Sequence, residues 1–246
     1  MGKKLIHERS TVDNGEIEHF KTLNQRWWSG KSKLQSFNDV RVPYIFNALL
    51  LTENIKSVEN LKILDVGCGG GLLSEELAKL GAIVDAIDPG SDSVEVARHH
   101  ASLNPTLVNL TYIVTTIEEH AIENAEKYDV VIASEVVEHV TEKEMFLEAC
   151  IKCLKPNGSL FITTFNKTIR SWIMGIVLIQ EVLNIIPRGT HAWNKFISPD
   201  AIRKILEIHN CKTVDVQGIR FNFLSRSWSQ SSSTSINYAL HAKKIL

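Results

Sequence analysis

A glycine-rich turn between two apolar runs carries the residues whose spacing points most directly to chemistry. The apolar run at 63–66 leads into glycines at 67, 69, 70 and 71, and a second run at 82–87 ends on Asp88. Glycine lets a backbone approach a ligand closely, and a carboxylate at Asp88 can accept hydrogen bonds from both hydroxyls of a ribose. With an amphipathic stretch between the runs, the pattern predicts the first βαβ unit of a nucleotide-binding sheet. The alternative is a tight turn followed by a surface aspartate.

The spacing of these glycines also bears on which nucleoside is bound. A dinucleotide fingerprint has glycines at the first, third and sixth positions, whereas the sixth position of this turn is Leu72. Asp65, just before the turn, suits a cationic ligand better than a pyrophosphate. A sulfonium that carries an adenosyl and an amino-acid group fits both observations. The pattern therefore favours methyl transfer over hydride transfer.

Glu135, Glu138 and His139 form a second set with chemical potential. In a helical turn they stand at i, i+3 and i+4, so all three would project from one side. Two carboxylates and an imidazole can hold a divalent cation, with Mg²⁺ favoured by the oxygen ligands and Zn²⁺ or Mn²⁺ tolerated by the imidazole. The alternative is a solvated acidic helix start, which the helix dipole favours.

Residues before the glycine turn offer further candidates. Arg41 is expected just before the Pro-marked first turn of a helix, where its guanidinium can bind the carboxylate of an amino-acid ligand or remain solvated. Trp27 and Trp28 lie in the first of two helical stretches expected within residues 16–50. They either cap the open edge of the sheet or help to roof the ligand crevice.

The elements that must position these residues alternate between strand and helix. Further strands are expected at 110–114, 128–133, 159–165, 213–221 and 236–242, and further helices at about 91–103, 117–125, 141–155 and 198–209. This alternation predicts a doubly wound parallel sheet. Because ligands of such sheets bind outside the carboxyl ends of the strands, Gly67, Asp88, Ser134 and Asn166 should share one rim.

Bulk properties exclude several classes of protein. With 246 residues, a formal net charge of −1 and 44% hydrophobic residues, the chain suits a single α/β domain and shows no electrostatic sign of nucleic-acid binding. No uncharged run is long enough to span a membrane. Cys150 and Cys153 are expected on the apolar face of a helix, where they pack in the protein core. The Ser-rich stretch at 225–235 is expected to be a loop.

The segment 168–188 is more apolar than a crossover helix requires. It is either a buried core helix or a lid over the crevice that also rests in a membrane interface. In the second case Trp172 would anchor it, flanked by Lys167, Arg170 and Arg188. Such a lid would suit a substrate with a long hydrocarbon tail.

Several motifs together resemble the ubiquinone-biosynthesis O-methyltransferases, which methylate polyprenylated catechols and related quinols. The matching stretches cover nearly the whole chain: WWSG at 27–30, NDVRVPYI at 38–45, ILDVGCGGGLLSE at 63–75, ASEVVEHV at 133–140, LKPNGSLFITTFNKT at 154–168, GTHAWNKFISP at 189–199 and INYALHA at 236–242. The glycine motif is common to many methyltransferases, whereas EVVEHV with GTHxWxKF is specific to this family. ASEVVEHV and LFITT look closer to the mitochondrial branch than to the bacterial one. Asn157 departs from the usual LKPGG, a change that a turn tolerates.

The resemblance implies a single class I S-adenosylmethionine-dependent methyltransferase domain over residues 1–246. Its Rossmann-like doubly wound sheet would be mostly parallel with an antiparallel edge strand, with an N-terminal helical cap at about 16–55 and an apolar lid insertion at about 168–190. Arg41, Gly67, Asp88 and Ser134 would contact S-adenosylmethionine, and Glu135, Glu138 and His139 would bind Mg²⁺. The implied location is peripheral, on the matrix side of the mitochondrial inner membrane, in a complex with other ubiquinone-biosynthesis proteins. The N-terminus has no visible transit peptide, so this compartment rests on the family.

The expected reaction is in-line transfer of a methyl group from the sulfonium to a phenolic oxygen of a polyprenylated substrate. His139 and His191 are candidate proton acceptors, and neither is assigned as a general base. Three other functions remain open. They are a non-catalytic S-adenosylmethionine-binding scaffold, a methyltransferase of another small phenol, and an oxidoreductase, which Leu72 disfavours.

Overall fold

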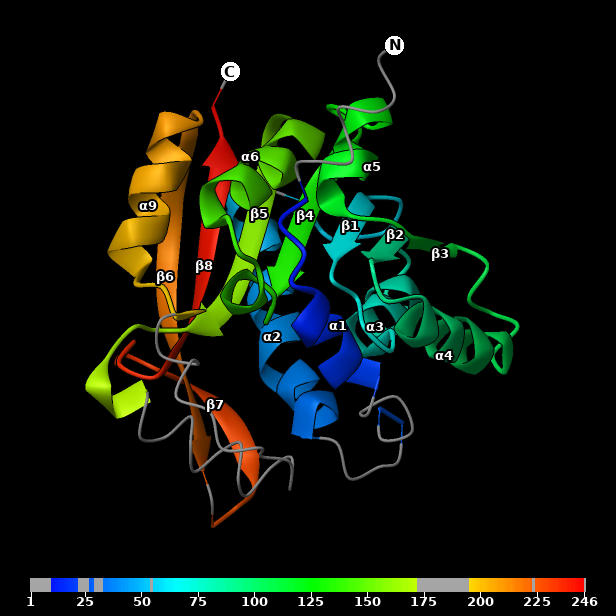
Figure 1. The fold of residues 1–246 in the computed structure, drawn as a ribbon, viewed down its shortest axis with the longest axis horizontal. Coiled ribbons are helices and arrows are strands. Elements are labelled where there is room, and N and C mark those ends of the chain that lie inside the picture. The colour runs from blue at the N-terminus through cyan, green and yellow to red at the C-terminus, as the bar shows by residue number, and fades with distance from the viewer. Residues whose placement is uncertain are drawn as a thin grey trace.

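The sheet at the centre of the molecule positions the glycine turn, Asp88 and Ser134 at the ends of its strands. The computed structural model describes residues 10–21, 27–28, 33–53, 55–171, 195–222 and 224–245. Within these residues the sheet has eight strands in the order β3-β2-β1-β4-β5-β8-β6-β7, and Figure 1 shows β6 at the left and β3 at the right. The strands are β1 (Lys62–Val66), β2 (Ile83–Asp88), β3 (Leu110–Val114), β4 (Tyr128–Ser134), β5 (Leu154–Phe165), β6 (Cys211–Asn222), β7 (Ser227–Ser231) and β8 (Asn237–Lys244).

Strands β1 to β5 are parallel, as the alternation of strand and helix predicts. β8 runs antiparallel to both of its neighbours, β5 and β6, and β7 pairs with β6 in an antiparallel hairpin. The expected mostly parallel sheet with an antiparallel edge strand is confirmed, and the antiparallel pairing extends over β8, β6 and β7. The strand order reverses between β1 and β4, and this switch point is where such sheets bind ligands.

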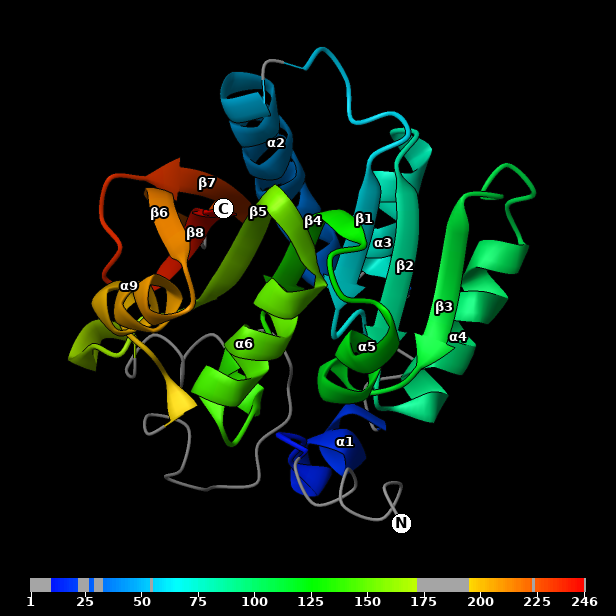
Figure 2. The ribbon, with the colours of Figure 1, turned by 90° about the horizontal axis from the view of Figure 1, so that it is seen from above.

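Helices cover both faces of the sheet (Figure 2). One apolar cluster joins α2, α3 and α4 to one face, and the other joins α5, α6 and α9 to the opposite face. The described helices are α1 (Asn14–Lys21), α2 (Lys33–Glu53), α3 (Leu72–Lys79), α4 (Ser91–Ser102), α5 (Ile117–Glu123), α6 (Lys143–Cys153) and α9 (Pro199–Ile208). The chain is therefore doubly wound.

Central strands are buried on both sides, which explains their continuous apolar runs. Val131 and Ile132 are neighbours in β4, and both are completely buried although they face opposite clusters. Cys150 and Cys153 lie in the same core, as expected from their place on the apolar face of α6.

Two local predictions were wrong. α2 begins at Lys33, so Pro43 lies inside the helix and not in its first turn. Proline has no N–H to donate to the carbonyl four residues earlier, and α2 continues past this missing bond because its apolar side chains pack against the sheet. The Ser-rich stretch at 225–235 contains β7, because its backbone pairs with β6 and Trp228 packs against Phe37 and Phe221.

The expected helical cap at about 16–55 overlaps α1 and α2. Most of the expected lid at about 168–190 falls on residues 172–194, which lie outside the described residues. None of the helices within the described ranges is long and apolar enough to cross a membrane.

Candidate cofactor and active site

The glycine turn connects β1 to α3 in a conformation that few other residues could adopt. Gly67, Gly69 and Gly71 have φ values of +71°, +52° and +83°, in the left-handed region that side chains disfavour. A Cβ at Gly71 would also overlap the hydroxyl of Tyr112. The N–H of Gly67 donates to the carbonyl of Ile87 at 2.8 Å, which fixes the turn to the end of β2.

Asp88 at the tip of β2 lies against this turn. Its Oδ2 accepts the N–H of Gly69 at 2.9 Å, and its Oδ1 accepts the N–H of Gly90 at 2.7 Å. Burial raises the pKa of Asp88, and the two backbone hydrogen bonds oppose this rise. Because each carboxylate oxygen has a second lone pair, Asp88 can still accept the hydroxyls of a ribose.

Asp65 supplies a second buried carboxylate beneath the turn. Its Oδ2 accepts the hydroxyl of Ser74 at 2.6 Å, and its side chain is almost completely buried. Burial raises the pKa of Asp65 to about 6, although Ser74 and the charge of Arg41 work in the opposite direction. Negative charge at this position suits a cationic ligand above the turn.

The structure brings Arg41 and Ser134 together from α2 and β4. Nη1 of Arg41 donates to Oγ of Ser134 at 2.9 Å, and Nε donates to Oδ1 of Asn38 at 2.7 Å. Burial lowers the pKa of Arg41 to about 10, opposed by the charges of Asp65 and Glu135. A buried guanidinium at the rim can pair with an anionic group of a ligand.

The three residues expected to bind a metal do not converge. Glu135 has a φ of +59° and precedes the short 3₁₀ helix η2 (Val137–His139), so the assumed helical turn does not exist. Thr163 donates to Glu135 at 2.8 Å and Thr164 donates to Glu138 at 2.7 Å. Each carboxylate therefore accepts a hydrogen bond from a different residue of β5. Within the described ranges no group of three His, Cys, Asp or Glu side chains could hold a metal ion.

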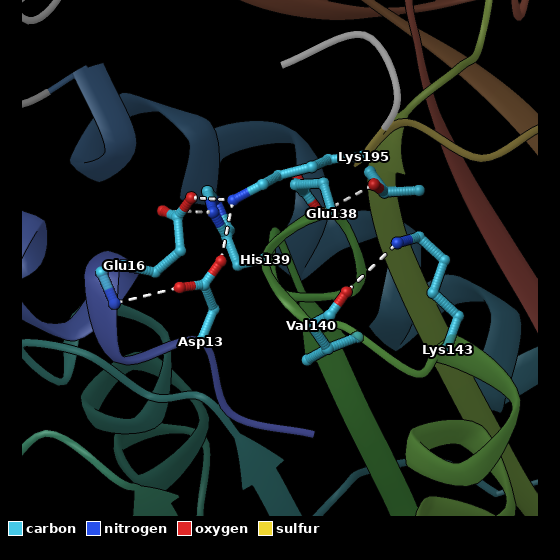
Figure 3. A network of polar contacts seen from close by, with 9 residues as sticks. Asp13, Glu16, Glu138, His139, Val140, Lys143 and Lys195 are labelled. Carbon is cyan, nitrogen blue, oxygen red and sulfur yellow. Dashed lines mark hydrogen bonds and ion pairs between the residues drawn. The ribbon is translucent and has the colours of Figure 1, made fainter. Parts of the chain in front are cut away.

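His139 instead pairs with a residue from the N-terminal helix α1 (Figure 3). Its Nδ1 lies 2.9 Å from Oε2 of Glu16. Lys195 donates to Oε1 of Glu16 at 2.6 Å and to Oδ2 of Asp13 at 3.0 Å. The contact with His139, and secondarily that with Lys195, lowers the pKa of Glu16 to about 2. Burial lowers the pKa of His139, but Glu16 and nearby Glu138 outweigh this effect, so the pKa of His139 is raised.

Backbone contacts hold the N-terminal segment in this place. The N–H of Thr141 donates to the carbonyl of Thr11 at 3.0 Å, and Val12 forms a β-bridge with Val140. Glu16 and Lys195 therefore belong to the site, and of these two residues Lys195 lies in the family motif GTHxWxKF. Their contacts could not be predicted from spacing, since Glu16 is 123 positions from His139 and 179 from Lys195.

The adjacent tryptophans lie against the glycine turn. Nε1 of Trp28 donates to the carbonyl of Gly70 at 2.8 Å. A Cβ at Gly69 would come within 2.9 Å of the Trp27 ring, and one at Gly70 would overlap that ring. Of the two roles considered for the pair, these contacts favour the one at the ligand crevice. His191, the other candidate proton acceptor, lies outside the described residues.

Comparison with known sequences identifies the family. Residues 39–216 match the model of a methyltransferase domain. The chain is 46% identical to the mitochondrial ubiquinone biosynthesis O-methyltransferase of Rattus norvegicus, over 98% of this chain and 72% of that protein. It is 38% identical to the ubiquinone biosynthesis O-methyltransferase of Bartonella bacilliformis, over 96% of this chain and 98% of that protein. The chain is also 46% identical to the mitochondrial ubiquinone biosynthesis O-methyltransferase of Homo sapiens, and it spans 66% of that protein's length.

Solved structures share the fold at much lower identity. One is magnesium protoporphyrin IX methyltransferase from Synechocystis PCC 6803, solved with bound S-adenosylhomocysteine. It has a TM-score of 0.58 and 20% sequence identity, and the match covers 98% of this chain and 92% of that protein's chain. A methyltransferase from Aquifex aeolicus that depends on S-adenosylmethionine has a TM-score of 0.56 and 17% identity, covering 93% of this chain and 98% of its own. These likenesses establish the class of fold around the glycine turn.

Proposed function

We propose that this chain, which belongs to the ubiquinone biosynthesis O-methyltransferase family, methylates a phenolic oxygen of polyprenylated catechols and hydroquinones. The observation that carries the proposal is the similarity over nearly the full chain to mitochondrial and bacterial relatives that share this name. The rim formed by the glycine turn, Asp65 and Asp88 suits the cofactor that such a reaction needs. S-adenosylmethionine supplies a methyl group on a positively charged sulfur.

Each rim residue has a distinct part in holding that cofactor. Asp88 accepts the ribose hydroxyls beside its two backbone bonds, and Asp65 contributes negative charge opposite the cationic end. Arg41 and Ser134 face the carboxylate of the amino-acid group. Burial of Asp65 and Arg41 keeps water from the reacting atoms, so the protein contributes mainly orientation and solvent exclusion.

No general base is assigned. His139 and His191 remain the candidates for accepting the phenolic proton. Glu16 orients His139 through Nδ1, which makes Nε2 the nitrogen with the lone pair in the neutral ring.

A divalent cation, Mg²⁺ by family resemblance, is proposed at Glu135, Glu138 and His139, without any catalytic step assigned to it. The contact of Nδ1 of His139 with Glu16 is compatible with a metal at Nε2, because ligating imidazoles usually pair their second nitrogen with a carboxylate. For all three residues to bind one ion, their side chains must come closer together than in this structure. The support is electrostatic, because burial and the charge of Glu138 both raise the pKa of Glu135, and a cation between the carboxylates would relieve this repulsion.

Binding of Mn²⁺, followed by its electron paramagnetic resonance signal, tests this site. The wild type should bind the ion, and Glu135→Gln and Glu138→Gln should bind it weakly. Full turnover after treatment with a chelator, together with an absence of Mn²⁺ binding, would eliminate the metal.

Peripheral attachment to the matrix side of the mitochondrial inner membrane is also proposed, with other ubiquinone-biosynthesis proteins as partners. The support is the mitochondrial designation of the rat and human relatives and the apolar sequence at 168–188 with its basic flanks. Replacing both Ile176 and Leu183 with Asp should release the protein from vesicles that contain anionic lipid, because it removes apolar area from the interface. Unchanged sedimentation with vesicles would place the contact elsewhere.

Incubation with labelled S-adenosylmethionine and a short-tailed polyprenyl catechol tests the main proposal. Label should appear on the catechol. A scaffold would bind the cofactor without transfer, and a methyltransferase of other phenols would prefer a substrate without the tail. Either result would contradict the proposed function.

A further inference from the structure

Trp28 makes a direct hydrogen bond to the cofactor turn from outside the sheet. Its Nε1–H donates to the carbonyl of Gly70 at 2.8 Å. The turn has few side chains of its own, and glycine has more backbone freedom to lose than any other residue. External contacts therefore decide how well the turn keeps the conformation that directs its N–H groups.

The ring of Trp28 is itself held by His100 of α4. The two rings are stacked with centroids 3.4 Å apart and an angle of 3° between their planes. On its other side, Nδ1 of His100 lies 2.7 Å from Oε1 of Glu75.

Glu75 completes the connection back to the turn. It lies in α3, which begins at Leu72 directly after the glycines, and only 1% of its side chain is exposed. A buried carboxylate is costly unless it is paired, so the His100 contact is expected to be persistent. Contacts thus run from the turn to Trp28, to α4 and back to the helix that the turn begins.

We propose that Trp28, His100 and Glu75 are positioning residues that hold the glycine turn in its cofactor-binding conformation. The inference rests on the proposed function only for the identity of the cofactor. These residues act on the affinity for S-adenosylmethionine and S-adenosylhomocysteine, and the transfer step proceeds normally once the cofactor is bound.

The conservative variant Trp28→Phe separates the hydrogen bond from the stacking. Phenylalanine keeps an aromatic ring for His100 and loses the donor to Gly70. A neutral hydrogen bond corresponds to a change of about fivefold in an equilibrium constant. Calorimetry should therefore show a dissociation constant for S-adenosylhomocysteine that is about fivefold higher. Trp228→Phe is the matched control, because Trp228 packs against Phe37 and Phe221, and it should leave this constant unchanged.

Kinetics and thermal melting distinguish positioning from a general structural role. In Trp28→Phe the KM for S-adenosylmethionine should rise while kcat and the KM for the phenol stay unchanged. His100→Ala should raise the same KM, and Glu75→Gln, which keeps a hydrogen-bond acceptor, should raise it less.

Several results would overturn the inference. An unchanged dissociation constant in Trp28→Phe, or a fall in kcat alone, excludes a role in cofactor affinity. An equal loss of melting temperature with and without S-adenosylhomocysteine indicates a role in stability only. Calorimetry does not depend on methyl transfer, so failure of the proposed function would leave this test intact.

Discussion

Replacing Asp65 with asparagine should remove a cost of folding that appears only when the carboxylate is ionised. Burial raises its pKa from an ordinary 3.8 to about 6, and each pKa unit corresponds to about 1.4 kcal/mol. The folded state therefore holds this proton more tightly than the unfolded state does. As pH rises from below 3.8 to above 6, the wild type loses about 3 kcal/mol of stability through Asp65, of which about 2 kcal/mol falls between pH 4.5 and 7.5.

Asparagine can still accept the hydroxyl of Ser74 but does not titrate. The free energy of unfolding of Asp65→Asn minus that of the wild type should therefore increase by about 2 kcal/mol from pH 4.5 to pH 7.5. Urea unfolding at the two pH values measures this change. Asp200→Asn is the control for the loss of a surface carboxylate, because the Asp200 side chain is 81% exposed.

Loss of the same charge should weaken cofactor binding. Asp65→Asn should lower the affinity for S-adenosylmethionine more than that for S-adenosylhomocysteine, since only the former carries a sulfonium charge. If the stability difference between variant and wild type is the same at both pH values, Asp65 titrates normally and the burial argument is refuted. If both cofactors lose affinity equally, Asp65 does not act through the sulfonium.

Three further changes probe the same rim. Asp88→Ala should weaken cofactor binding about tenfold to a hundredfold through the loss of charge-assisted hydrogen bonds, and calorimetry with unchanged affinity would remove Asp88 from the site. Gly71→Ala should lower the free energy of unfolding by about 1–3 kcal/mol, because the new Cβ would overlap the Tyr112 hydroxyl at a residue whose φ is +83°. A urea midpoint equal to that of the wild type would contradict this. Glu16→Gln should lower the pKa of His139 toward 6.5, measured by NMR titration, and an unchanged pKa would show that the pair is weak. In the wild type, the stability from this pair should decline as pH falls from 4.5 to about 2 and again as pH rises through the raised pKa of His139.

The parts that could be predicted from sequence are those specified by short-range patterns. Strand, glycine turn, helix and strand lie within 28 consecutive positions at 62–89, and each step has a local physical cause. Gly67 and Asp88 follow from that pattern, because the carboxyl ends of parallel strands meet at one edge. The contact of Arg41 with Ser134 needed the fold as well, because the family resemblance implied only that each of them contacts the cofactor.

The parts that could not be predicted depend on backbone conformation or on distant partners. A helical spacing was assumed for Glu135, Glu138 and His139, whereas Glu135 has a left-handed φ of +59° directly after the end of β4. Glu16 lies in a stretch of mixed charge where nothing local distinguishes it from a solvated side chain. Lys195 lies in GTHxWxKF, a motif that indicates the family but not this contact. Their roles arise because the N-terminal segment pairs with Val140 and Thr141, which follow η2.

The position of β8 has a consequence for the order in which the molecule can be completed during translation. β6 and β7 are synthesised earlier, but β6 pairs with the rest of the sheet only through β8. At about 5–20 residues per second, a nascent β6–β7 hairpin waits on the order of seconds for the strand that joins it to β5. Until then β5 presents an unpaired edge, which is a template for aggregation. A ribosome that stalls between β7 and β8 would therefore leave a cofactor-binding half that is folded and an edge that a chaperone must cover.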